Sequence, residues 1–432
     1  MNLKTRFRSL AMRRFSSASH LENQRHKARK QREKTGTPPV VHYFHQVDDP
    51  YSHLSVQKLD QLRARYQIKF QPHLTSAPSP AFQGSAQHFN QWALRDALSI
   101  AADYQTEFPP AATPPALEQV RLANTTLAAH LNRDDFATTA IAIGHDLWAG
   151  TPNASTDSRQ PAHLAEQAVQ AGNRQRNKFG HYQGAMFYFE GEWFWGVDRI
   201  RLLEQRLSDE GFDSEPGPLC VAEPTPRPLD GKSVAGIVLE YFPSLRSPYT
   251  AIGHSRVLDL VERTGVRLEV RPVMPMLMRG IPAPRAKQSY IITDSGREGR
   301  AHGCPLGKIV DPFGSPVLRA FALFPGAQSL GLAMPFVTAY LQAAWFKGID
   351  ITREEGLKRV AANAGIDWPS LQKAAAKADW QAVLADNLAA MDQEHLWGVP
   401  SFRVSGGHKH NAYACWGQDR IWRVANEIES RC

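Results

Sequence analysis

The sequence predicts an α/β protein of two tandem domains, each built from a βαβ unit and a ββα unit separated by a helical insertion. Three observations lead to this prediction: an internal repeat, a strand–helix–strand pattern, and a late hairpin followed by a helix. Each half opens with an apolar run before Pro-Tyr, in residues 41–52 and 239–250, and closes with Trp-Gly-x-Asp-Arg-Ile, in residues 195–200 and 416–421. A spacing of about 200 residues suits a duplicated domain and is too long for a solenoid repeat.

Composition agrees with two globular domains. The chain has 432 residues, of which 42% are hydrophobic and 21% charged, and its net charge is +8. Residues 1–34 hold 11 of the 50 Lys and Arg residues and 2 of the 42 Asp and Glu residues, so this segment carries +9 and the remainder −1. Because the basic charge is confined to one end, we expect no nucleic-acid partner. No apolar run reaches the roughly 18 residues of a membrane span.

Residues 1–38 form a basic N-terminal extension that has three interpretations. Its large apolar residues lie at roughly helical spacing among arginines, which suits a helix on an anionic membrane surface: Leu3, Phe7, Leu10 and Phe15. Residues 1–21 contain serines and no acidic residue, which also fits a transit peptide and a mitochondrial location. The third interpretation is an unstructured, solvated segment. We expect a cytoplasmic protein, peripheral to the membrane under the first interpretation.

The second half begins with a strand–helix–strand pattern. Residues 236–242 form an apolar run between Gly and Pro, as in a buried strand. Residues 249–263 have apolar positions at helical spacing, and residues 266–270 alternate as a second strand before Arg271-Pro272. A connection of this length makes the two strands parallel, so they form a βαβ unit.

A helical insertion and a ββα unit complete this half. Helix-forming composition with Gly, Asp or Pro between segments predicts helices at 287–293, 316–323, 330–346, 353–364 and 368–392. Residues 399–404 and 412–415 are predicted to form a hairpin, and residues 419–428 a closing helix. A βαβ unit followed by a hairpin and a helix is the thioredoxin-like plan.

The first half, residues 39–210, follows the same thioredoxin-like plan. Its hairpin strands are predicted at 185–189 and 193–195, on either side of Glu190-Gly191. Residues 211–233 are rich in Pro, Gly and acidic residues, so they are predicted to be a linker that buries almost nothing. The second domain then spans residues 234–432.

The cysteines disfavour dithiol chemistry. They are scattered, without a Cys-x-x-Cys pair, at Cys220, Cys304, Cys415 and Cys432. This spacing provides neither a redox dithiol nor a metal site. We therefore expect buried or incidental thiols in a reducing compartment, and no metal.

Four motifs occur in order in the second half: Ser247-Pro248-Tyr249, Pro284–Asp294 (PRAKQSYIITD), Gly398–Phe402 (GVPSF) and Gly417–Arg420 (GQDR). With these motifs the second half resembles the DsbA-like thioredoxin superfamily, within it the branch of 2-hydroxychromene-2-carboxylate isomerases and kappa-class glutathione transferases. Members of this branch have a Ser in place of the redox cysteines, so the resemblance implies that the attacking sulfur comes from bound glutathione.

The resemblance also implies the site residues. Ser247 would donate a hydrogen bond to the glutathione thiolate at a helix N-terminus, where backbone N–H groups favour an anion. The remaining predicted contacts to glutathione come from Lys287, Val399, Pro400, Gln418 and Asp419, with the Val399–Pro400 peptide bond in cis. Four of these residues have a structural alternative: Ser247 and Asp419 also suit helix caps, Pro400 an edge strand, and Lys287 a solvated helix face.

Two departures from the family pattern are present, and the first half departs further. Arg246 stands where the family has an apolar residue, and the Asn that precedes the double proline of the family is missing. In the first half Asp48-Asp49 replaces Arg246-Ser247, and two carboxylates would repel a thiolate. The first half is therefore predicted to be a non-catalytic partner that packs with the second half as an internal pseudo-dimer.

From the resemblance we expect a glutathione-dependent isomerase or transferase that acts on a small aromatic or electrophilic compound. Both activities need the same thiolate: sulfur that adds to an alkene and leaves again isomerises it, and sulfur that stays transfers glutathione. The alternative is a non-catalytic scaffold of the same fold that binds glutathione or a peptide.

Overall fold

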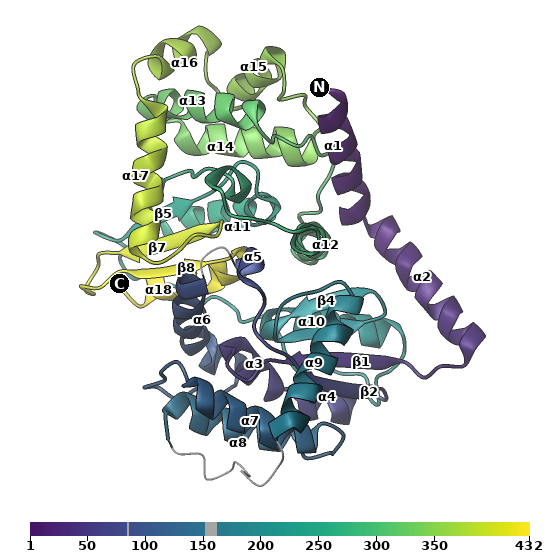
Figure 1. Ribbon diagram of the computed structural model, residues 1–432. Helices are drawn as coiled ribbons and strands as arrows, with labels where there is room; N and C mark the ends of the chain where they lie inside the picture. The colour runs from purple at the N-terminus through teal and green to yellow at the C-terminus, as the bar shows by residue number, and fades with distance from the viewer. Residues whose placement is uncertain (84–85, 152–161) are drawn as a thin grey trace. The chain divides into compact units, whose positions relative to one another are not determined.

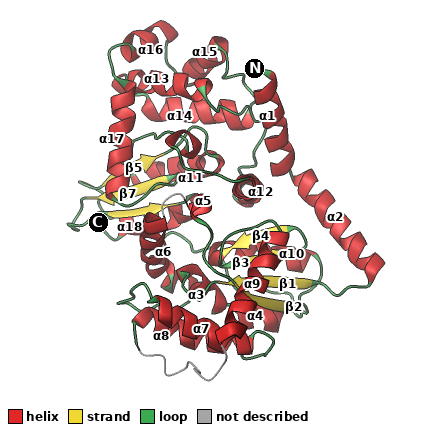
Figure 2. Ribbon diagram, viewed as in Figure 1, coloured by secondary structure: helices red, strands yellow, loops and turns green. Residues whose placement is uncertain are grey.

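The computed structural model describes residues 1–83, 86–151 and 162–432 (Figure 1). The chain divides into two compact units. The C-terminal unit comprises Met1–Leu21, Thr225–Pro282 and Ile291–Cys432, and the N-terminal unit comprises Glu22–Pro224 and Ala283–Tyr290. Each unit contains one four-stranded sheet, and helices dominate the rest of the described chain (Figure 2).

The sheet of the C-terminal unit has the strand order β6-β5-β7-β8. Its strands are β5 (Val238–Phe242), β6 (Arg267–Val270), β7 (Ser401–Ser405) and β8 (Tyr413–Trp416). Strand β5 pairs in parallel with β6 and antiparallel with β7, and β7 pairs antiparallel with β8. The predicted βαβ unit and the late hairpin are thus confirmed in this half.

Two helices cover this sheet with apolar side chains. They are α11 (Pro248–Thr264), which connects β5 to β6, and α18 (Ile421–Glu429), which follows the short η4 turn (Gln418–Arg420). The core between these helices and the strands includes Leu239, Tyr241, Val257, Phe402 and Val424. Strand β5 is buried on both faces, which explains why its sequence is a continuous apolar run.

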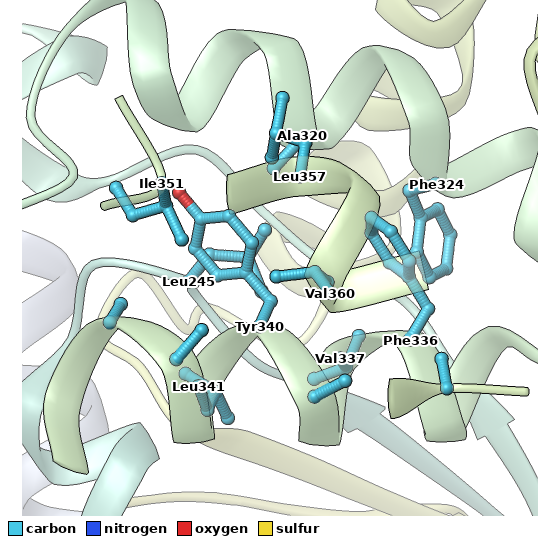
Figure 3. Close-up of a cluster of buried hydrophobic side chains, with 14 of the residues drawn as sticks. Leu245, Ala320, Phe324, Phe336, Val337, Tyr340, Leu341, Ile351, Leu357 and Val360 are labelled. Atoms are coloured by element: carbon cyan, nitrogen blue, oxygen red, sulfur yellow. The ribbon is translucent and has the colours of Figure 1, made fainter. Parts of the chain in front are cut away.

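The helical insertion has its own core. Its helices are α12 (Arg285–Ala301), α13 (Ser315–Ser329), α14 (Ala333–Leu341), the π-helical turn η3 (Gln342–Phe346), α15 (Glu354–Asn363), α16 (Trp368–Ala375) and α17 (Trp380–Gln393). Phe336 and Tyr340 of α14 point into a cluster with Phe324 of α13 and Leu357 and Val360 of α15 (Figure 3).

One predicted helix of the insertion is wrong. Residues 368–392 form two helices, α16 and α17, with a break between them. Asp379 causes the second start, because its carboxylate accepts hydrogen bonds from the backbone N–H groups of Gln381 (2.9 Å) and Ala382 (3.2 Å).

The sheet of the N-terminal unit has the order β2-β1-β3-β4, with the same pairing directions. Its strands are β1 (Val40–His45), β2 (Lys69–Leu74), β3 (Met186–Phe189) and β4 (Glu192–Trp195). The helices are α3 (Pro50–Val56), α4 (Leu59–Arg65), α5 (Pro80–Gln83), α6 (Ala86–Ile100), η1 (Ala102–Tyr104), α7 (Leu117–His130), α8 (Phe136–Ala149), α9 (Ala162–Lys178) and α10 (Gly196–Asp209). Its hairpin turns at Glu190-Gly191, as predicted, with both φ angles positive.

The basic extension is helical. It forms α1 (Leu3–Ser16) and α2 (Ala18–Thr35), so the interpretation as an unstructured segment is wrong. Asn2 starts α1, because its side-chain oxygen accepts the backbone N–H of Thr5 at 2.8 Å. Among the described residues, no helix combines the length and the apolar character that crossing a membrane requires.

The predicted linker is irregular but anchored. Val221 is buried, and the backbone N–H groups of Cys220 (2.7 Å) and Val221 (2.8 Å) donate to the carboxylate of Glu204. The prediction that this segment buries almost nothing is therefore wrong at Val221.

Candidate functional site

Ser247 forms the N-cap of α11. Its backbone is extended, and its hydroxyl oxygen accepts the N–H of Thr250 at 3.1 Å. Pro248 at the first helical position has no N–H to satisfy, and its fixed φ suits a helix start. The capping role that the sequence offered as an alternative is thus present in the structure.

Ser247 also contacts the segment before β7. Its hydroxyl donates to the carbonyl oxygen of Val399 at 3.3 Å, and the Val399–Pro400 peptide bond is cis. The carbonyl oxygen of Pro400 in turn accepts the N–H of Gly417 at 2.9 Å, next to Gln418. The structure therefore brings Ser247, Val399 and Pro400 to the same end of the sheet as Gln418 and Asp419 of the η4 turn.

Gln418 is buried and is held at both ends of its amide. Its NH₂ group donates to Glu298 of α12 at 2.7 Å, and Arg256 of α11 donates to its oxygen. Gly253 of α11 permits this closeness, because a Cβ there would lie 2.8 Å from the Cβ of Gln418. The amide that was predicted to hold glutathione thus already joins α11 to α12.

Lys287 has its observed contact in the N-terminal unit. The first turns of α12, through Tyr290, belong to that unit, and the ammonium group of Lys287 donates to the carbonyl oxygen of Phe82 at 2.7 Å. Burial lowers the pKa of Lys287 to about 8. The alternative of a solvated helix face is wrong for this residue, and its glutathione contact stays a prediction.

Asp311 is a residue of the site that the sequence did not reveal. Its carboxylate is fully buried and accepts hydrogen bonds from Nε of Arg246 (2.8 Å) and Nε of Arg8 (2.6 Å). Both guanidinium groups also lie over the ring of Phe313, 4.6 Å and 5.3 Å from its centroid. Two cations on one carboxylate leave a net positive charge beside the start of α11, where the helix dipole also favours an anion.

Tyr249 links the first two sequence motifs. Its hydroxyl donates to Asp294 of α12 at 2.8 Å, and Arg297 donates to the other oxygen of the same carboxylate at 3.1 Å. Asp294 is fully buried. Tyr249 of the first motif and Asp294 of the second therefore occur together because their hydrogen bond joins α11 to α12.

With this geometry established, comparison with known families identifies the second half. Residues 238–429 form a DSBA-like thioredoxin domain. Similar solved structures include a 2-hydroxychromene-2-carboxylate isomerase, which is 17% identical with a TM-score of 0.37. The alignment covers 95% of that protein and 45% of this chain. The cytosolic disulfide reductase DsbM from Pseudomonas aeruginosa is 18% identical with a TM-score of 0.35, over 98% of its length and 45% of this chain. No curated protein matches the chain.

The DSBA-like thioredoxin domain has no thiol at the start of α11. All four cysteines of the chain are free, and burial raises the pKa of Cys304 and of Cys432 above its usual value. Cys415 is buried in β8. Within residues 1–83, 86–151 and 162–432, no group of 3 or more His, Cys, Asp or Glu side chains could hold a metal ion.

In the N-terminal unit, Asp49 has the place that Ser247 has in the DSBA-like domain. It caps α3 by accepting the N–H of Ser52 at 3.0 Å, and the Ser52 hydroxyl donates to the same oxygen at 2.8 Å. Burial raises the pKa of Asp49 to about 7. Near neutral pH, Asp49 is therefore partly protonated, and the start of α3 carries less negative charge than the two ionised carboxylates that the sequence predicted.

Proposed function

We propose that the DSBA-like thioredoxin domain binds glutathione at the N-terminus of α11 and uses its thiolate to isomerise or conjugate a small aromatic or electrophilic compound. The observation that carries this proposal is that a serine hydroxyl, not a thiol, caps α11 next to Val399. Because no cysteine stands at this helix start, the proposal takes the reactive sulfur from a ligand.

The residues around Ser247 suit such a ligand. In the part of the chain that the structure describes, the backbone N–H of Val399 has no hydrogen-bond partner, so it is available to a peptide-like molecule. The N–H groups of the first turn of α11 and the net positive cluster of Arg8, Arg246 and Asp311 favour an anion beside it. Both features would stabilise a thiolate and lower the pKa of a bound thiol.

Ser247 is the proposed donor to the sulfur. Its hydroxyl has one proton, which now points to the carbonyl of Val399. Rotation of this hydroxyl would redirect the proton to a thiolate while the oxygen keeps the N–H of Thr250. Bound glutathione supplies a thiolate that adds to an activated carbon of the substrate and then either leaves, giving isomerisation, or stays, giving transfer.

We also infer that the N-terminal unit is a duplicated, non-catalytic copy of the same domain. Its sheet has the same order and pairing directions, and Pro50-Tyr51 follows its capping residue as Pro248-Tyr249 follows Ser247. Asp49 in the place of Ser247 supports the loss of thiolate chemistry in this copy.

A second candidate function is a scaffold that binds glutathione or a peptide without chemistry. The engaged amide of Gln418 favours it, because the contacts to Glu298 and Arg256 leave that amide no free end for a ligand.

Calorimetry with reduced glutathione tests the proposal. We expect binding at millimolar concentration or tighter, together with the ultraviolet absorbance of a thiolate, and we expect Ser247→Ala to retain binding but lose the thiolate signal. Binding without a thiolate signal in the natural protein would favour the scaffold. Absence of binding at millimolar glutathione would reject both the isomerase and the transferase and would leave only a scaffold that binds a peptide.

A further inference from the structure

Helix α1 faces the protein with a mostly polar side, from which Met12 also packs on the core of the helical insertion, and it has most of its large apolar side chains in solvent. The side chains of Thr5, Ser9 and Ser16 are buried in the C-terminal unit. The large apolar residues are exposed instead: Leu3 at 82%, Phe7 at 74%, Leu10 at 51% and Phe15 at 44%. A water-facing helix of a globular protein has the reverse arrangement.

Polar contacts along the whole of α1 hold it in this orientation. The N-terminal ammonium pairs with Asp350 at 3.0 Å, and Nε of Arg8 donates to Asp311 at 2.6 Å. The Ser9 hydroxyl oxygen accepts the backbone N–H of Asp311 at 2.9 Å. At the other end, Arg300 of α12 donates to the carbonyl oxygen of Ser16 at 2.7 Å, and α12 lies beside α1 (Figure 1).

These contacts make α1 an integral part of the C-terminal unit. Arg8 is one of the two cations that neutralise the buried carboxylate of Asp311, so removal of α1 would leave that carboxylate with Arg246 alone. Gly296 of α12 reinforces the fit, since a Cβ there would lie 2.5 Å from the carbonyl oxygen of Ser16. An apolar face on a helix that is fixed this way cannot turn inward without breaking these contacts.

The exposed face combines an apolar stripe with unpaired positive charge. Leu3, Phe7 and Leu10 are spaced by four and three residues, which places them on one side of the helix. Basic side chains lie beside the stripe and at its C-terminal end, and no described carboxylate pairs with them: Lys4, Arg6, Arg13 and Arg14. Residues 1–21 contain no acidic residue.

We propose that α1 binds the surface of an anionic lipid bilayer. The stripe of Leu3, Phe7 and Leu10 enters the boundary between headgroups and acyl chains, and the flanking Lys and Arg side chains contact the lipid phosphates. The positive charge of α1 is complementary to the negative charge of the lipid headgroups, which favours an anionic bilayer as the partner of this face. A second copy of the chain would place the same positive charges against one another, which opposes self-association through this face.

Vesicle flotation of the full chain tests this inference. We expect binding to phosphatidylcholine vesicles that contain roughly 30% phosphatidylserine, weak binding to phosphatidylcholine alone, and weaker binding at high salt. Leu3→Ser, Phe7→Ser and Leu10→Ser together should abolish binding. Replacing Lys4, Arg6, Arg13 and Arg14 by Gln should weaken it by several hundred-fold, since each basic residue contributes roughly a fivefold factor.

Leu117→Ser is the matched control. Leu117 is exposed to a similar extent, at 79%, but lies on α7 of the N-terminal unit, so its substitution should leave vesicle binding unchanged. An unchanged melting temperature of the triple Ser variant would show that α1 remains docked through its polar side. No flotation with anionic vesicles, or equal flotation of the triple Ser variant, would refute the inference. A dimer in light scattering that the triple Ser variant loses would instead assign the face to a second copy.

Discussion

The hydroxyl of Ser247 donates to the carbonyl of Val399 at 3.3 Å while its oxygen accepts the N–H of Thr250 at 3.1 Å. The two bonds are chemically different, because the first uses the only proton of the hydroxyl and the second uses a lone pair. A ligand that takes the proton therefore competes with Val399 and leaves the helix cap intact. This relationship allows one residue to stabilise the fold and to serve a thiolate.

Ser247→Ala should separate these two roles. Loss of the N-cap is expected to lower the unfolding free energy by about 1 kcal/mol. In the proposed function the same substitution removes the donor to glutathione sulfur, so the pKa of the bound thiol should rise, which a pH titration of thiolate absorbance measures.

The matched control for Ser247→Ala is Asp367→Ala. Asp367 caps α16 by accepting the N–H of Ser370 at 3.0 Å, so its loss also removes a helix cap, but far from α11 in sequence. It should leave the thiol pKa unchanged. Equal thiol pKa values for Ser247→Ala and the natural protein would exclude Ser247 as the donor.

Asp311→Asn should destabilise the C-terminal unit strongly. The buried carboxylate of Asp311 compensates the charges of Arg8 and Arg246, so its neutralisation leaves two guanidinium groups without a counter-ion. Breaking a fully buried ion pair costs about 3–5 kcal/mol, and the side chains of Arg8 (38%) and Arg246 (19%) are partly exposed, so we expect a loss of roughly 2–3 kcal/mol. Hydrogen exchange of peptides from α1 and α11 should therefore speed up in this variant.

Asp60→Asn provides the comparison for Asp311→Asn. Asp60 pairs with Arg63 at 3.2 Å on an exposed helix face, so its neutralisation should change stability by less than about 1 kcal/mol. If Asp311→Asn exchanged as slowly as Asp60→Asn, the Arg8–Asp311–Arg246 cluster would not be holding α1 against the C-terminal unit.

The elements that the sequence predicted well are those with a local signal. The apolar run of β5, the helical spacing of α11 and the alternation of β6 are contained within about 35 residues, and secondary-structure patterns act over such distances. The break before α17 also has a local signal, an Asp before Trp380, but uninterrupted helix-forming composition on both sides concealed it.

Tertiary contacts of single residues could not be predicted in the same way. Arg8 and Asp311 are 303 positions apart, and neither lies in a periodic pattern, so only the folded chain brings them together. Lys287 is a second example, since the sequence offered a solvated helix face as one alternative and the fold provides the carbonyl oxygen of Phe82 as a partner. Motif spacing indicates which residues lie on one helix, and burial decides what each of them contacts.

The N-terminal unit should lose stability in acid before the C-terminal unit does. Burial lowers the pKa of five of its histidines, to about 4 for His42, His53 and His73 and to about 3 for His45 and His181. Their unfolded pKa is 6.5, so between pH 6.5 and about 4 the unfolded state binds more protons and stability falls as pH falls. In the C-terminal unit, burial lowers the pKa of His254 to about 4.

Hydrogen exchange of the full chain between pH 4 and pH 7 measures this difference, with one unit as the internal control for the other. After correction for intrinsic exchange rates, peptides of β1 and β2 should lose protection on acidification earlier than peptides of β5 and β6. Parallel loss of protection in the two units would contradict the prediction.

Asp49 should affect stability with a pH dependence opposite to that of the buried histidines, and Asp49→Asn tests this. Burial raises the folded pKa of Asp49 from 3.8 to about 7, so between these values the native state holds a proton that the unfolded state has released. The contribution of Asp49 to stability is therefore complete below pH 3.8 and is lost as pH rises toward 7. Asn caps a helix as well as Asp and does not titrate, so the variant keeps the bond to Ser52 without this loss.

We expect the unfolding free energy of Asp49→Asn to exceed that of the natural protein by an amount that grows from acid to neutral pH and levels off above pH 7. Its size should be on the order of a few kcal/mol, because each pKa unit corresponds to about 1.4 kcal/mol. Urea unfolding at a series of pH values measures it. Asp367→Asn is the control, since the hydrogen bond from Ser370 lowers the pKa of that cap and its substitution should give no such advantage at neutral pH. A difference between Asp49→Asn and the natural protein that did not change with pH would show that Asp49 is ionised in the native state throughout this range.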